Sequence, residues 1–239
     1  MNFLITGGAS GLGHAITTAI GNNFPDSQVY FTFNSSSDSA KALEDQYKKL
    51  HSIKCDFRKK EEVEKLCEFI SNADIDILIN NAITKLDKQY FHKTPGGGYL
   101  ESFNADIVPT LDITQSFIVK AREKKSGKII TILTSALLSY PPTGWSIYLA
   151  NKSYLLSMHK SWASENKAFN ITSNCVSPGF LATPLHGEMD ERVIENMIKA
   201  HPLKKLLTVE EVAQVVLFLC SASSQLNGQN IVLNSAADF

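Results

Sequence analysis

The sequence predicts an α/β protein in which about seven parallel strands form one doubly wound sheet with helices on both faces. Short apolar runs alternate with longer segments of helical periodicity along the whole chain. The apolar runs are continuous, as expected for strands buried on both faces of a parallel sheet. An alternation sustained over 239 residues favours right-handed crossovers and a single domain, residues 1–239.

Seven short apolar segments are expected to be strands. In chain order they are residues 2–6, 28–33, 52–56, 75–80, 128–134, 170–176 and 229–234. Longer segments between them have the periodicity of helices, and the clearest are residues 11–23, 38–50, 60–72, 100–124, 148–166 and 209–222.

The composition is that of a globular protein, with 44% hydrophobic residues and a formal net charge of −1. This balance predicts neither nucleic acid nor an acidic membrane as a partner. The four cysteines form no C-x-x-C motif and adjoin no His cluster, so no metal site is expected. The chain shows no signal peptide and no apolar run of membrane-span length, so a cytoplasmic protein is expected.

A glycine-rich turn follows the first strand and opens the first helix. Gly7, Gly11 and Gly13 follow the pattern T-G-x-x-x-G-x-G. Glycines in this place allow the backbone to approach a pyrophosphate, and the helix N-terminus adds free N–H groups and a partial positive charge. The turn therefore predicts a dinucleotide site of the Rossmann type, although any strand–helix turn can use glycine. A P-loop is excluded because no lysine follows the glycines.

Polar residues follow the third and fourth strands, at the sheet edge where such folds bind ligands. The Asp56 carboxylate could accept a hydrogen bond from an adenine amino group, or it could simply cap the next helix. Asn80 and Asn81 could satisfy backbone groups of the loop while Ala82 leaves room for adenosine. Simple turn chemistry is the alternative for this pair.

The end of the second strand bears on the choice between NADP(H) and NAD(H). An Asp or Glu about 20 residues beyond the glycines usually binds the ribose 2′-hydroxyl. Here Asn34 and Ser35 follow the strand, and no acidic residue occurs before Asp38. Small polar side chains can hydrogen-bond a 2′-phosphate, so NADP(H) is expected over NAD(H). Because no arginine adjoins them, the affinity for the phosphate is expected to be modest and salt-sensitive.

Tyr148 and Lys152 are four positions apart and therefore share one face of a helix. They are either ordinary neighbours or a proton donor and the charge that tunes it. An ammonium about 4 Å from a phenol is worth roughly 4 kcal/mol at an effective dielectric of ~20. That energy would lower the phenol pKa by up to about 3 pH units.

Taken in order, these motifs resemble those of the short-chain dehydrogenase/reductase family. They are TGGASGLG at 6–13, NNA at 80–82, Asn104, Ser135, YLANK at 148–152 and SPGFLAT at 177–183. The intervals of 13 residues from Ser135 to Tyr148 and 44 from Asn104 to Tyr148 fit the family pattern. The resemblance covers nearly the whole chain, and within the family it is strongest to 3-oxoacyl-(acyl-carrier-protein) reductases.

The resemblance implies an NAD(P)(H)-dependent oxidoreductase that interconverts a small-molecule carbonyl and a secondary alcohol, with a 3-oxoacyl thioester as the candidate substrate. A polyol or sugar dehydrogenase is one alternative. A dinucleotide-binding pseudoenzyme acting as a scaffold or sensor is the other. It is supported only by Ile83, where the family has glycine, and by NSA at 234–236, which replaces a terminal Gly-Gly. A homo-oligomer, either a tetramer or a dimer, is expected through the helices at 100–124 and 148–166.

The resemblance also assigns roles to individual residues. Tyr148 would donate the proton, Ser135 would hydrogen-bond the substrate oxygen, and Lys152 would hold the ribose hydroxyls. Asn104 would hold a water that links Lys152 to solvent. The implied catalytic residues are Asn104, Ser135, Tyr148 and Lys152. The implied cofactor-binding residues are Gly7, Ser10, Gly11, Leu12, Gly13, Asn34, Ser35, Asp56, Phe57, Asn80, Ala82, Tyr148, Lys152, Pro178, Gly179, Leu181 and Thr183.

Two segments are expected to enclose the substrate. Residues 184–205 are interpreted as a lid, in which His186, Met189 and Met197 would line the pocket unless they serve only helix packing. Residues 139–145 would form the opposite wall, with Trp145 near the Tyr148 helix.

Overall fold

The computed structural model describes residues 1–86, 88–183, 185 and 190–237. Its seven parallel strands form one sheet in the order β3-β2-β1-β4-β5-β6-β7. Their bounds are β1 Phe3–Ile5, β2 Val29–Phe33, β3 Leu50–Lys54, β4 Ile77–Asn80, β5 Gly127–Ile132, β6 Ile171–Pro178 and β7 Asn230–Leu233. The predicted doubly wound sheet is therefore confirmed. From β1 the strands β2 and β3 are added towards one edge of the sheet, and β4 to β7 are added towards the other edge. Folds of this kind bind ligands at the point between β1 and β4 where this order changes.

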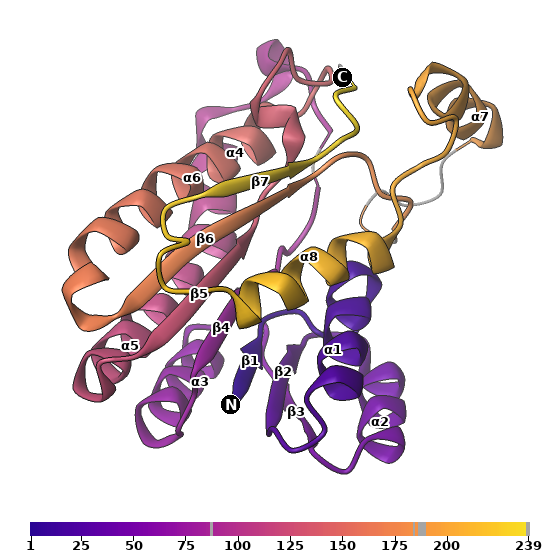
Figure 1. Ribbon diagram of the computed structural model, residues 1–239. Coiled ribbons are helices and arrows are strands. Elements are labelled where there is room, and N and C mark those ends of the chain that lie inside the picture. The colour runs from indigo at the N-terminus through magenta and orange to yellow at the C-terminus, as the bar shows by residue number, and fades with distance from the viewer. Residues whose placement is uncertain (87, 184, 186–189, 238–239) are drawn as a thin grey trace.

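Helices cover both faces of the sheet (Figure 1). Their bounds are α1 Gly11–Asn23, α2 Ser37–Gln46, α3 Lys60–Asn72, α4 Gly96–Ser102, α5 Val108–Lys124, α6 Ser146–Asn166, α7 Glu191–Ala200 and α8 Val209–Ser221. The helices α1, α2 and α8 bury their apolar stripes in one core, and α3, α5 and α6 bury theirs in the other. The strands between these two cores are apolar on both faces because each face meets a helix layer.

The predicted helix at 38–50 is too long. The helix α2 ends at Gln46, and a turn in which the Leu50 N–H donates to the Tyr47 carbonyl leads into β3. Leu50 is buried and pairs with Val29 of β2, so its burial in the sheet outweighs a continued helix. The third strand therefore occupies residues 50–54, two residues earlier than expected.

The predicted helix at 100–124 is interrupted. A π-helical turn, Phe103–Ile107, separates α4 from α5. Turns of this kind insert an extra residue and rotate the side chains before them relative to those after them. The spacing along the sequence therefore no longer identifies which side chain faces the sheet.

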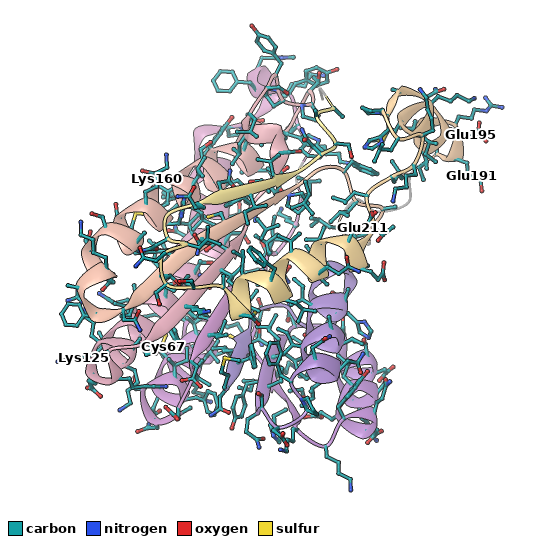
Figure 2. All side chains as sticks on the ribbon, in the orientation of Figure 1. Cys67, Lys125, Lys160, Glu191, Glu195 and Glu211 are labelled. Atoms are coloured by element: carbon teal, nitrogen blue, oxygen red, sulfur yellow. The ribbon has the colours of Figure 1, made fainter. Side chains whose placement is uncertain are left out.

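The helix α7 lies within the expected lid and stands away from the body of the molecule (Figure 1). Its labelled glutamates, Glu191 and Glu195, point away from the body (Figure 2), whereas Ile194 and Met197 are half-buried. The helix α7 therefore has a polar outer side and an apolar stripe. No helix in the described ranges is both long and apolar enough to cross a bilayer.

Candidate active site

A cleft of about 530 Å³ opens at the carboxyl ends of the strands. Its walls come from the loops after β1, β2, β3, β4, β5 and β6 and from the start of α6, so it spans the point where the strand order reverses. Most residues predicted to bind a cofactor line it: Gly7, Ser10, Gly11, Leu12, Gly13, Asn34, Ser35, Phe57, Ala82, Tyr148, Lys152, Pro178, Gly179, Leu181 and Thr183.

The glycine turn at the start of α1 has no room for side chains. Gly7 and Gly11 have φ of 67° and 50°, in the left-handed region that favours glycine. A Cβ on Gly13 would overlap the Gly7 carbonyl oxygen and lie 2.7 Å from the Asn81 amide nitrogen. Ser10 makes no side-chain cap at the helix N-terminus, so the first N–H groups of α1 can receive an anion.

The turn is held by the ends of neighbouring strands. The Gly7 N–H donates to the Thr32 hydroxyl of β2 over 2.9 Å. The Asn81 side-chain amide donates to the carbonyls of Thr6 and Gly7 over 3.0 and 3.1 Å. These hydrogen bonds fix the turn in a shape that suits a dinucleotide pyrophosphate, which agrees with the function predicted for Gly7, Gly11 and Gly13.

Asn80 and Asp56 are predicted binding residues that do not line the cleft. The buried Asn80 side chain donates to the Thr114 hydroxyl over 2.9 Å, so it joins β4 to α5, and Asn81 is the residue that reaches the glycine turn. The Asp56 carboxylate accepts two hydrogen bonds from the Arg58 side chain, at 2.9 and 2.8 Å, which lowers the Asp56 pKa to about 2. Both of its oxygens therefore have a partner in Arg58, and the contact with an adenine amino group stays a prediction.

Tyr148 and Lys152 meet at the floor of the cleft. The Lys152 ammonium nitrogen lies 5.8 Å from the centroid of the Tyr148 ring and donates to the Ile132 carbonyl over 2.7 Å. The Trp145 ring contacts the Tyr148 ring edge to face, with centroids 5.6 Å apart, and Trp145 lines the cleft as expected. The two predicted catalytic side chains thus share one face of α6, and that face is turned inward.

Burial governs the ionisation of both groups. It raises the pKa of Tyr148 to about 12, although a hydrogen bond with the Thr134 side chain opposes the rise. The expected lowering of the phenol pKa is therefore wrong, because Lys152 directs its ammonium to Ile132 and burial outweighs other influences. Burial also lowers the pKa of Lys152 to about 8, against the opposing charge of Asp106.

The hydroxyl beside Tyr148 belongs to Thr134, whereas Ser135 was predicted there. Thr134 lines the cleft and is hydrogen-bonded to Tyr148. Ser135 is 1% exposed, and its hydroxyl has no hydrogen-bond partner among the described residues. Thr134 is the last extended residue before a 3-10 turn that begins at Ser135, and of the two hydroxyls only that of Thr134 lines the cleft in this structure. The role of Ser135 in binding the substrate oxygen stays a prediction.

Asn104 is likewise displaced from its expected place. It is exposed in the π turn, whereas Asp106, two residues later, is buried and its charge acts on Lys152. Residues two apart in a helix differ by about 200° in direction, so the turn brings only one of them to Lys152. A lone acidic residue among apolar neighbours was the signal for Asp106 in the sequence.

The expected lid contributes less to the cleft than predicted. Among its described residues, Leu185 lines the cleft and Met197 does not. Pro184, His186 and Met189 lie outside the described residues. No cluster of three or more potential metal-ligating side chains occurs in the described ranges.

Comparisons with known proteins agree with this geometry. A family model described as enoyl-(acyl carrier protein) reductase matches residues 7–235. The chain is 30% identical over 240 residues to the 3-oxoacyl-(acyl-carrier-protein) reductase FabG of Aquifex aeolicus, covering 97% of this chain and 94% of the relative. It is 30% identical over 161 residues to an acetoacetyl-CoA reductase of Acinetobacter sp., covering 67% and 65%. A solved short chain dehydrogenase/reductase family protein has 26% identity and a TM-score of 0.83, with 98% and 96% covered.

Proposed function

Because the chain belongs to the short-chain dehydrogenase/reductase family and is an NAD(P)-dependent oxidoreductase, we propose that it reduces a 3-oxoacyl thioester with NADPH. The observation that carries this proposal is the inward-facing group of Tyr148, Lys152 and Thr134 on the floor of a dinucleotide-sized cleft. The thioester class is supported by the names of relatives that match nearly the whole chain.

The cleft has the features that a nicotinamide dinucleotide requires. The glycine turn leaves the backbone accessible to the pyrophosphate, and Lys152 can donate to the ribose hydroxyls. The bound nicotinamide supplies the hydride for carbonyl reduction. Pro178, Gly179, Leu181 and Thr183, which follow β6, line the same cleft as Tyr148 and would hold the carboxamide.

The protein supplies the proton and orients the carbonyl. The Thr134 hydroxyl can hydrogen-bond the substrate oxygen and hold it against the Tyr148 phenol, which donates its proton to that oxygen. With its pKa raised to about 12, Tyr148 is protonated at neutral pH. A loaded proton donor suits reduction, whereas oxidation would require a phenolate that burial disfavours.

The preference for NADPH rests on the end of β2. Asn34, Ser35 and Ser36 line the cleft where the ribose 2′-position is expected, and Ser36 precedes α2 without capping it. The side chains and the helix N-terminus provide donors for a 2′-phosphate. No acidic residue adjoins them before Asp38, which is exposed in the first turn of α2.

The helices α5 and α6 support the proposal of a homo-oligomer. Leu155 and Trp162 are buried within the chain, but Val108, Val119 and Tyr154 expose 37%, 59% and 38% of their surface on these same helices. Such apolar surface suits a second copy of the chain better than water. A tetramer would use it together with a second face, and a dimer would use it alone.

The test is reduction of acetoacetyl-CoA, followed through the loss of NADPH absorbance, in the wild type and in Tyr148→Phe. We expect turnover in the wild type, a loss of at least about 100-fold in kcat in the variant, and unchanged NADPH affinity. A variant that keeps more than about a tenth of wild-type kcat would overturn the role of Tyr148. Oxidation of sugars or polyols without thioester reduction would overturn the substrate class.

A further inference from the structure

A small cavity of about 20 Å³ adjoins the catalytic lysine, beneath the main cleft. Its polar lining consists of Lys85, Ser102, Asp106, Tyr148, Asn151 and Lys152. A space of this size holds one water molecule, and a buried water requires two to four polar partners, which this lining provides. The residues around this one cavity therefore include a carboxylate, Asp106, and the catalytic lysine, Lys152.

The Asp106 carboxylate is held firmly in this cavity. One oxygen accepts a hydrogen bond from the Thr84 N–H over 2.7 Å. The other is 3.5 Å from the Ser102 hydroxyl, which itself accepts from the Asn151 amide over 3.0 Å. These contacts come from the loop after β4, from α4 and from α6, so three separate elements orient the carboxylate. Asp106 is only 7% exposed.

Lys152 needs a nearby negative charge to remain an ammonium. It is 7% exposed, and its one hydrogen bond in the structure goes to the neutral carbonyl of Ile132. The titratable groups around it are Asp106 from the π turn, Tyr148 from its own helix, Lys85 from the loop after β4 and the Cys175 thiol from β6. Burial keeps the phenol and the thiol protonated. It also raises the pKa of Asp106, but the Thr84 hydrogen bonds and the Lys152 charge oppose that rise, so the carboxyl of Asp106 is the group that can carry the negative charge. Asp106 itself faces Tyr148, Lys152 and Lys85.

We propose that Asp106 is a positioning residue whose ionised carboxylate, acting across the small cavity, keeps Lys152 in its ammonium form. An amide in this place would hold the same water but would leave the buried ammonium without a counter-charge. The carboxylate thus extends the working range of the Tyr148–Lys152 pair to higher pH. The effect of Asp106 on the pKa of Lys152 does not depend on the proposed function. Only the expected change in the pH dependence of kcat rests on the proposed function.

The electrostatic part is tested by titrating Lys152 in protein carrying ¹³C at the lysine ε-carbon. The Lys152→Arg variant identifies the Lys152 signal by its loss. In the wild type we expect a midpoint near pH 8, and in Asp106→Asn a midpoint lower by at least about one pH unit. The matched control is Asp112→Asn, which removes the same charge from an exposed position on α5 and should leave the midpoint unchanged.

The catalytic part is tested by the pH profile of kcat. A midpoint lowered by one pH unit leaves Asp106→Asn almost fully active at pH 6 and about fivefold slower than the wild type at pH 8. Asp106→Glu, which restores the charge, should recover most of the loss. If Asp106→Asn does not fold, Asp106→Ser carries the same expectation with a smaller side chain.

The outcomes separate this inference from the proposed function. A Lys152 midpoint that stays in place or rises in the neutral variants overturns the role of Asp106, whatever the turnover. A lowered midpoint in a protein that reduces no thioester supports the role of Asp106 and overturns the proposed function. A lowered midpoint with an unchanged kcat profile shows that the charge does not serve catalysis and overturns the inference.

Discussion

Replacing Lys152 by methionine should stabilise the folded protein at neutral pH relative to the wild type. The gain in unfolding free energy should be larger at neutral pH than at alkaline pH. The lysine pKa falls from 10.5 to about 8 on folding because the ammonium is buried. A lysine with a lowered folded pKa binds its proton more weakly in the folded state than in the unfolded one. Its charge therefore opposes folding fully below about pH 8, and the opposition fades as the pH rises towards 10.5.

The magnitude follows from the size of that shift. A difference of 2.5 pH units corresponds to about 3 kcal/mol of destabilisation at pH 7, and somewhat under 1 kcal/mol of it remains at pH 10. Methionine removes this contribution and keeps the apolar stem. Losing the hydrogen bond to Ile132 costs about 1–3 kcal/mol, but that cost is the same at both pH values. The advantage of the variant should therefore decline by about 2 kcal/mol between pH 7 and pH 10.

The assay is urea unfolding of the wild type and Lys152→Met at the two pH values. Lys160→Met is the control, because Lys160 is exposed on the same helix and should show no such dependence. A difference in unfolding free energy that is equal at both pH values would refute the buried-ammonium argument.

The other predictions concern the cleft and the assembly. Thr134→Ala should lower kcat at least about 10-fold because it removes the hydroxyl beside Tyr148, whereas Ser135→Ala should leave kcat within about twofold. Equal losses of kcat in steady-state assays of the two variants would contradict the assignment of Thr134. The wild type should have the higher kcat/KM with NADPH, and Asn34→Asp should reverse this by repelling the 2′-phosphate; a wild type that prefers NADH would contradict the cofactor proposal. Gly13→Ala should abolish NADPH binding in calorimetry because its Cβ overlaps backbone, and Gly97→Ala, with open space around its Cβ, is the control; retained binding in Gly13→Ala would count against a rigid glycine turn. Light scattering should find a dimer or tetramer at micromolar concentration, and a monomer would oppose the use of α5 and α6 as an interface.

The sequence by itself determined the sheet and most of the cofactor cleft. The glycine turn and the Tyr148–Lys152 pair are local patterns, since each depends only on residues within one turn or one helix. The seven apolar strands are equally local patterns, because continuous apolar runs that alternate with helices favour a parallel sheet covered on both faces. Tertiary packing agrees with such patterns and does not change them.

Tertiary structure decided which side chain of a neighbouring pair faces the site. Thr134 and Ser135 differ by one residue at a strand end, and Asn104 and Asp106 lie on opposite sides of a π turn. Spacing along the chain cannot resolve these choices, because one extra residue in a turn reverses the direction of a side chain. The same packing set the ionisation of Tyr148 and Lys152, since burial depends on the helices and strands that surround α6 and not on the four-residue interval between the two side chains.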